Sequence, residues 1–207
     1  MTAHALQPAL PGYESMRRVW HHAHQCYGAR IMPGEYYVTK HDELIATTLG
    51  SCVSACIRDP STGIGGMNHF MLPADDRQDL SVYDMSARYG NFAMEHMIND
   101  ILKHGGRRER LEVKVFGGGN VLPTMTEIGT KNIHFVREYL STEGFRISAE
   151  DLGGDSPRKV IYFPATGKVL MQRVKLSRRD EQEITRKEME YQRSLESKPI
   201  AGDIDLF

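Results

Sequence analysis

Residues 44–73 read LIATTLGSCVSACIRDPSTGIGGMNHFMLP, a stretch that predicts two strands joined by a tight turn. Residues 53–58 are a short apolar run rich in small and β-branched side chains. Residues 59–63 (DPSTG) signal a turn, because the proline fixes φ and the glycine permits a positive φ. The chain resumes over 64–72 and stops at Pro73, which has no backbone N–H to donate to another strand. We therefore expect a β-hairpin.

This hairpin would bring a cysteine close to a histidine. If Asp59 pairs with Ile64, the numbers of facing residues sum to 123, so Cys52 faces Met71 and His69 is its diagonal neighbour. Diagonal Cβ atoms on paired strands lie about 7 Å apart, within reach of a long side chain. A slip of one residue would put the two side chains on opposite faces, so the prediction depends on this register.

A thiol beside an imidazole can attack a carbonyl carbon. The imidazole favours the reactive thiolate and can later protonate a leaving group. Gly50 and Ser51 add backbone N–H groups next to the sulfur, where they could stabilise an oxyanion. The alternative is structural: Cys52 would be a small buried side chain and His69 a hydrogen-bonded core residue. Geometry alone leaves both interpretations open.

Several short motifs, in order, extend well beyond the hairpin. Together they resemble the CheD family, the chemoreceptor glutamine deamidases of bacterial chemotaxis, over roughly residues 33–174. The motifs are LGSC (49–52), GGMNHFMLP (65–73), FGGGN (116–120), IG (128–129) with Asn132, EDLGG (150–154) and TGKV (166–169).

The resemblance implies an enzyme, a protein-glutamine glutaminase. In the family, a cysteine and a histidine at the positions of Cys52 and His69 deamidate glutamine, and de-esterify methylglutamate, on methyl-accepting chemotaxis receptors. The implied mechanism is thiolate attack on the side-chain carbonyl, with an oxyanion held near Ser51 and protonation of the departing ammonia by His69. This chemistry requires no metal and no organic cofactor.

The chain departs from the family pattern at one catalytic position. The family has a threonine six residues before the cysteine, where this chain has Ala46. Thr47 and Thr48 lie next to it. Because strand side chains alternate between faces, Thr48 shares the face of Ala46, and we expect Thr48 to orient His69.

The glycine run that follows the predicted strand 111–116 has two interpretations. No Lys-Ser or Lys-Thr follows at the spacing of a phosphate-binding loop, so nucleotide binding is not expected. The run is either a special backbone turn or a place where a substrate chain approaches closely. On the second interpretation Gly118, Gly119 and Asn120, together with Asn68 of the hairpin, lie near the substrate.

Composition limits the class of protein. The 207 residues carry a formal net charge of -1, which offers no overall attraction to nucleic acid. The sequence shows neither a signal peptide nor an apolar run long enough to insert in a membrane, so we expect a cytoplasmic protein. Its three cysteines are then expected to remain thiols.

The remaining segments predict an α+β fold. Apolar periodicity predicts two main helices, over 86–104 and 131–141 with Thr130 as the cap of the second. With about seven strands, they imply a single-domain α/β/β layered sandwich with mixed or antiparallel sheets. We expect an N-terminal extension (1–30), a deamidase domain (31–176) and a charged C-terminal tail (177–207) that is either a solvated helix or disordered.

Residues 21–26 (HHAHQC) contain possible zinc ligands, but their close spacing favours a frayed extension over a metal site. Two other functions stay open: a non-catalytic regulator that binds receptors or a CheC-type phosphatase, and a related cysteine acyl-transfer enzyme, either a transglutaminase or a protease. The expected partner is the helical cytoplasmic region of the receptors.

Overall fold

Two five-stranded sheets lie face to face in a computed structural model of the chain, which describes residues 5–73, 80–121, 126–174 and 178–197. One sheet has the order β1-β2-β4-β9-β10 and the other β3-β6-β5-β7-β8. The strands are β1 (Arg18–His21), β2 (Cys26–Arg30), β3 (Tyr36–Thr39), β4 (Glu43–Leu49), β5 (Val53–Arg58), β6 (Gly65–Asn68), β7 (Glu112–Gly117), β8 (Ile147–Leu152), β9 (Arg158–Phe163) and β10 (Lys168–Arg173).

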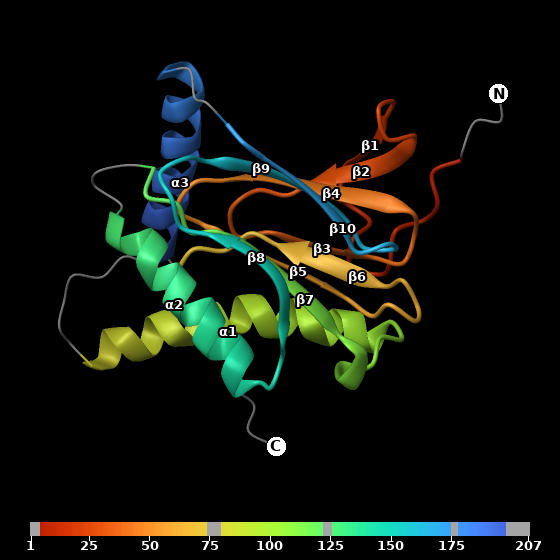
Figure 1. Cartoon of the computed structure of the whole chain (residues 1–207), viewed down its shortest axis with the longest axis horizontal. Helices are drawn as coiled ribbons and strands as arrows, with labels where there is room; N and C mark the ends of the chain where they lie inside the picture. The colour runs from red at the N-terminus through yellow and green to blue at the C-terminus, as the bar shows by residue number, and fades with distance from the viewer. Residues whose placement is uncertain (1–4, 74–79, 122–125, 175–177, 198–207) are drawn as a thin grey trace.

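Helices α1 (Leu80–Lys103) and α2 (Thr126–Thr142) cover the outer face of the second sheet, as Figure 1 shows. Helix α3 (Arg178–Ser197) stands apart from them, at one end of the two sheets. Each sheet contains one parallel pair, β2 with β4 and β7 with β8, and is otherwise antiparallel. The predicted α/β/β sandwich with mixed sheets is confirmed.

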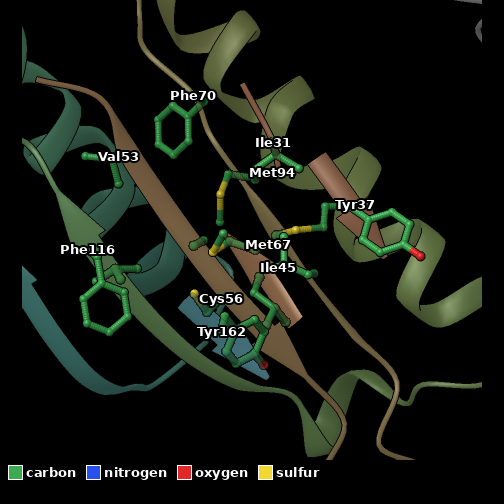
Figure 2. Close-up of a cluster of buried hydrophobic side chains, with 14 of the residues drawn as sticks. Ile31, Tyr37, Ile45, Val53, Cys56, Met67, Phe70, Met94, Phe116 and Tyr162 are labelled. Atoms are coloured by element: carbon green, nitrogen blue, oxygen red, sulfur yellow. The ribbon is translucent and has the colours of Figure 1, made fainter. Parts of the chain in front are cut away.

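The core fills the space between the sheets and beneath the helix layer. Figure 2 shows Ile45 and Tyr162 of the first sheet close to Cys56 and Met67 of the second, with Met94 of α1 nearby. All five side chains are at most 1% exposed. This packing fixes the inner face of β4, the strand that leads to Cys52.

The predicted hairpin has the predicted register. Cys56 pairs with Met67, Arg58 with Gly65, and an isolated bridge joins Val53 to Phe70, so all of these pairs sum to 123. Strand β6 spans only Gly65–Asn68, whereas the predicted strand covers 64–72.

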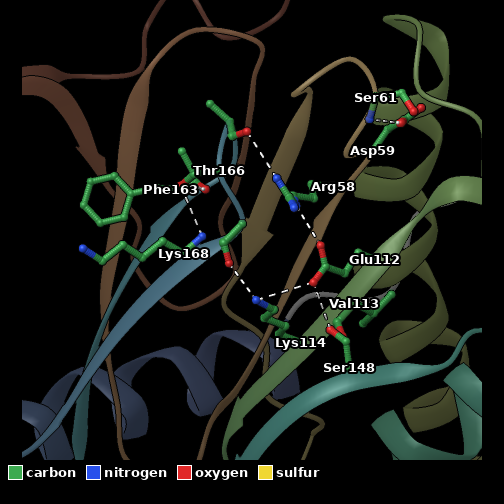
Figure 3. Close-up of polar contacts among 12 residues, drawn as sticks. Arg58, Asp59, Ser61, Glu112, Val113, Lys114, Ser148, Phe163, Thr166 and Lys168 are labelled. Atoms are coloured by element: carbon green, nitrogen blue, oxygen red, sulfur yellow. Dashed lines mark hydrogen bonds and ion pairs between the residues drawn. The ribbon is translucent and has the colours of Figure 1, made fainter.

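Polar contacts hold the two sheets together beside the hairpin (Figure 3). Arg58 of β5 donates to the Glu112 carboxylate at 2.8 Å and to the carbonyl of Ala165 at 3.2 Å. Lys114 donates to the carbonyl of Gly167 at 2.7 Å. The β9–β10 turn is therefore tied to β5 and β7, which limits sliding of one sheet over the other.

Several sequence-based expectations were wrong. Residues 18–30 are not a frayed extension: they form β1 and β2, and β2 pairs with β4. Helix α2 begins at Thr126, so Thr130 lies inside the helix and is not its cap. There are ten strands in the described residues instead of about seven, because strands as short as β1 and β2 show little periodicity. The HHAHQC run spans the turn between β1 and β2.

None of the helices in the described ranges combines the length and apolar character that a bilayer crossing requires.

Candidate active site

The hairpin places Cys52 just before β5 and His69 just after β6. Cys52 is 0% exposed and His69 2% exposed. The Cys52 sulfur, a ring nitrogen of His69 and a carboxylate oxygen of Glu188 all lie within 4.8 Å of one another. The two residues that the sequence singled out therefore meet, and a third residue from α3 joins them.

Thr47 orients the imidazole of His69. The Thr47 hydroxyl lies 2.7 Å from Nδ1 of His69 and 2.9 Å from the carbonyl oxygen of Ile31. A carbonyl only accepts, so the single hydroxyl proton goes to Ile31 and Thr47 accepts the bond from Nδ1–H. This fixes the neutral tautomer with an unprotonated Nε2. Nε2 is buried and has no hydrogen-bond partner among the described residues, which leaves it available to the Cys52 thiol.

The expected orienting residue, Thr48, does not make this contact. Among the described side chains it is Thr47 that hydrogen-bonds to His69, while Thr48 lines a cavity beside it. We expected Thr48 because the family threonine falls at Ala46, and strand alternation puts Thr48 on the same face as Ala46. In the structure Thr47 is buried, whereas Ala46 and Thr48 are half-buried, so Thr47 shares the core-facing side of β4 with its buried neighbours.

Three consecutive backbone N–H groups point into the site. Gly50 N–H donates to Oε1 of Glu188 at 2.9 Å, Ser51 N–H to Oε2 at 3.0 Å, and Cys52 N–H to Oε1 at 3.4 Å. The Ser51 hydroxyl adds a bond of 2.6 Å to Oε2. The expected role of Gly50 and Ser51 as anion-binding backbone is consistent with this arrangement.

The carbonyls of the same residues are held on the opposite side. Gly119 N–H donates to the Gly50 carbonyl at 2.8 Å, and Gly118 N–H to the Cys52 carbonyl at 2.8 Å. The Asn132 amide donates to the Ser51 carbonyl at 2.9 Å. Because each carbonyl faces the glycine run or α2, the N–H groups face the site.

Gly117 requires a residue without a Cβ. Its φ is +119°, and an added Cβ would lie 2.2 Å from the Cys52 carbonyl oxygen. A side chain here would force the Cys52 loop to move.

The four expected substrate-proximal residues lie elsewhere or support the loop. Asn68 is buried and accepts from Ala55 N–H at 2.8 Å through its side chain. Gly118 and Gly119 are buried beneath the Cys52 loop, and Asn120 is exposed. These contacts favour the special-turn interpretation of the glycine run.

Asn132 and Glu188 are the residues that sequence reasoning missed. Asn132 lies in one of the sequence motifs, but the motif does not indicate what its side chain does. The side chain also accepts a hydrogen bond from Leu72 N–H at 2.8 Å, so it ties the chain after His69 to Ser51. Glu188 is one of many acidic residues in a charged segment, and nothing in the pattern distinguishes it. Its burial (3% exposed) departs from the expectation of a solvated helix.

Burial and the Glu188 carboxylate set the protonation of the pair. Burial raises the pKa of Cys52 well above its usual value, and the adjacent carboxylate raises it further. Burial also lowers the pKa of His69 to about 3. In this arrangement the sulfur is a neutral thiol and the imidazole is neutral.

A cavity of about 250 Å³ opens beside His69, between α3 and the first sheet. Basic side chains of Arg30, Lys159 and Lys187 and the acidic side chains of Glu183 and Glu188 line it. Cys52 is not among the described residues that line this cavity, so a ligand there meets His69 without reaching the sulfur.

Cys52, His69 and Glu188 carry donor atoms of the types that bind zinc. However, both Glu188 oxygens already accept hydrogen bonds from the Gly50–Cys52 backbone. Such bonding is typical of an anion held by N–H groups, as in an oxyanion hole, and the proposed chemistry needs no metal.

Comparison with known proteins gives consistent matches. The family model described as CheD chemotactic sensory transduction matches residues 71–173, a region that begins just after His69. A protein of Hahella chejuensis named probable chemoreceptor glutamine deamidase CheD is 52% identical over 200 residues, 96% of this chain and 94% of the relative. Proteins with the same name from Halorhodospira halophila (47% over 202 residues; 96% and 93%) and Herminiimonas arsenicoxydans (54% over 181 residues; 86% and 88%) are also similar.

Proposed function

This chain belongs to the CheD family, and from that premise we propose that it hydrolyses glutamine side chains of chemotaxis receptors to glutamate, with Cys52 as the nucleophile. The observation that carries the assignment is the set of groups around the sulfur. An unprotonated Nε2 of His69 and three backbone N–H groups converge beside one cysteine. This is the donor and base arrangement that acyl transfer requires.

The reaction begins when Nε2 of His69 takes the thiol proton and the Cys52 sulfur attacks Cδ of the substrate glutamine. The carbonyl oxygen becomes an oxyanion, which accepts hydrogen bonds from Gly50, Ser51 and Cys52 N–H. The imidazolium, oriented through Nδ1–H by Thr47, then protonates the departing amine as the C–N bond breaks. Ammonia and a thioester result.

Water completes the cycle. Nε2, neutral again, takes a proton from water as the oxygen attacks the thioester carbon, and the same N–H groups hold the second oxyanion. The C–S bond breaks, the sulfur recovers its proton and the side chain leaves as glutamate. Hydrolysis of a methylglutamate ester follows the same steps with methanol as the leaving group.

We propose the helical cytoplasmic part of the receptor as the substrate region, and accordingly that this protein acts in the cytoplasm. A helix already delivers a side chain to the site, since α3 presents Glu188 there. A CheC-type phosphatase is a further proposed partner.

The test is conversion of glutamine to glutamate in a purified receptor cytoplasmic fragment, mapped by mass spectrometry. We expect Cys52→Ala and His69→Ala to abolish it. Cys56→Ala is the matched control, because Cys56 is also fully buried but lies in β5 facing Lys114 and Met67. If the wild type binds the fragment without converting it, the protein is a non-catalytic regulator and the deamidase proposal is wrong. Backbone cleavage or amine incorporation would indicate a protease or a transglutaminase.

A further inference from the structure

Helix α3 occupies the proposed catalytic site with a product-like side chain. The Glu188 carboxylate receives hydrogen bonds from Gly50, Ser51 and Cys52 N–H and from the Ser51 hydroxyl. It is also one of three groups that lie within 4.8 Å of one another, with the Cys52 sulfur and the His69 ring. The donors proposed to hold the reaction's oxyanion are therefore already in use.

Glutamate is the product of glutamine deamidation, and the two side chains have the same length. A glutamate presented on a helix, with its carboxylate on the oxyanion donors, matches a product that has not left. Among the described side chains of α3, those of Glu183, Arg186, Lys187 and Glu190 pair within the helix and face solvent or the cavity rim, so they add no second anchor of this kind.

The other described contacts of α3 centre on Tyr191, which packs against the edge of the core. The Tyr191 hydroxyl hydrogen-bonds to the hydroxyl of Tyr89 on α1, and the Tyr191 ring packs where a Cβ on Gly34 would lie. Met189, on the same turn as Glu188, is 38% exposed. Figure 1 shows α3 standing at the end of the sheets instead of within the helix layer formed by α1 and α2. Such a helix can detach without dismantling the sandwich.

Docked α3 closes the site in two ways. With α3 docked, Cys52 is 0% exposed, and the neighbouring cavity reaches His69 but not the sulfur. The docked helix also places a negative charge beside the group that must become a thiolate, and burial and this charge both raise the pKa of Cys52. A substrate glutamine cannot reach the oxyanion donors until Glu188 leaves them.

We propose that α3 is an intramolecular product mimic: it docks Glu188 in the pocket that takes the substrate glutamine and keeps the enzyme closed until a receptor helix displaces it. The proposal rests on the function proposed above for Cys52. It assigns the charged C-terminal segment a regulatory role and identifies the donors at residues 50–52 as the binding site for the substrate carbonyl.

The first test measures access to the sulfur and needs no receptor. Alkylation of Cys52 by iodoacetamide is followed by mass spectrometry in full-length wild type, Glu188→Ala and Glu190→Ala. Glu190 is the matched control because it lies on the same helix, is exposed and pairs only with Arg186 among the described residues. We expect about 10- to 100-fold faster alkylation in Glu188→Ala, the range set by losing hydrogen bonds to a charged group. Equal rates in all three proteins would overturn the proposal.

The second test converts the product mimic into a substrate. In Glu188→Gln the new amide lies against the Cys52 sulfur, so the sulfur should bond to its Cδ, release ammonia and yield the carboxylate after attack by water. Peptide mass spectrometry should find glutamate at position 188 in this variant and glutamine in the double variant with Cys52→Ala. Retained glutamine together with unchanged alkylation would contradict the docking of α3.

The same proteins separate this inference from the proposed function. Receptor deamidation should rise in Glu188→Ala and stay at the wild-type level in Glu190→Ala. If Glu188→Ala is alkylated faster but neither the receptor nor the glutamine of Glu188→Gln is deamidated, then α3 covers Cys52 but the protein is not a deamidase. Loss of receptor deamidation in Glu188→Ala would instead make Glu188 part of the catalytic machinery and refute the product-mimic role.

Discussion

Replacing Thr47 by valine should impair catalysis through the tautomer of His69. The substitution keeps the shape of the side chain but removes the hydroxyl that accepts from Nδ1–H at 2.7 Å and donates to the Ile31 carbonyl. Each buried group left without a partner costs about 1–3 kcal/mol. The imidazole can relieve this cost by carrying its proton on Nε2, but Nε2 is then no longer a base for Cys52.

The expected loss in kcat/KM is about 10- to 100-fold, because each factor of ten corresponds to about 1.4 kcal/mol. The assay is the initial rate of glutamine conversion in a receptor fragment. Thr47→Ser retains a hydroxyl and should stay within about threefold of wild type. Thr48→Val is the matched control, since Thr48 is the next residue of β4 and lines the cavity without bonding to His69.

A spectroscopic measurement makes the test independent of activity. Nitrogen-15 NMR of the His69 ring should show a protonated Nδ1 in the wild type and a shift toward protonated Nε2 in Thr47→Val. If Thr47→Val keeps full activity and the wild-type tautomer, or if Thr48→Val causes the larger loss, the role assigned to Thr47 is wrong.

Three further substitutions test the surroundings of the site. Asn132→Leu removes both buried hydrogen bonds of the amide, and we expect a loss of about 2–4 kcal/mol in unfolding free energy by urea denaturation, together with reduced deamidation. Hydrogen bonding to Arg110 lowers the pKa of the buried Asp59 to about 2, so the carboxylate stabilises the fold above its unfolded pKa near 4 and this stability is lost as pH falls through 2. Asp59→Asn should therefore cost about 2 kcal/mol at pH 7 and much less at pH 2 to 3; a pH-independent difference would refute the pairing. Gly117→Ala should destabilise the protein far more than Gly144→Ala, which shares a positive φ but has no atom within 4 Å of the added Cβ and should cost about 1 kcal/mol in a thermal melt.

Local chemistry made the hairpin predictable. The turn residues of DPSTG fixed its loop, and the assumed pairing of Asp59 with Ile64 set the register, so the proximity of Cys52 and His69 followed from the sequence. The helices α1 and α2 were predictable for the same reason, since their apolar stripes recur at the helical period. The C-terminal ends of both helices were predicted to within one residue, but both helices begin earlier than predicted, because propensity defines an interior better than a boundary.

The parts of the site that the sequence did not predict depend on contacts between segments that are far apart in the chain. Whether Thr47 or Thr48 faces His69 is decided by how the first sheet packs on the second, and strand alternation alone gives no absolute face. Glu188 carries no local signal at all, because a carboxylate in a charged helix is normally solvated. Its burial follows from the hydrogen bonds that it accepts from the N–H groups of Gly50 and Ser51. No pattern within α3 reveals these bonds.

The loops that these contacts close differ greatly in length. Thr47 and His69 are 22 positions apart, whereas Gly50 and Glu188 are 138 positions apart. In the folded sandwich, however, sequence separation does not measure the cost of opening, because strand β10 holds the chain as far as Arg173 and release of Glu188 frees only the segment that follows. The contact between Thr47 and His69 instead joins the two paired sheets. On gentle warming or in dilute urea, α3 therefore opens before the hairpin does. The rate of receptor deamidation should accordingly rise with temperature or urea concentration before it falls as the whole fold unfolds.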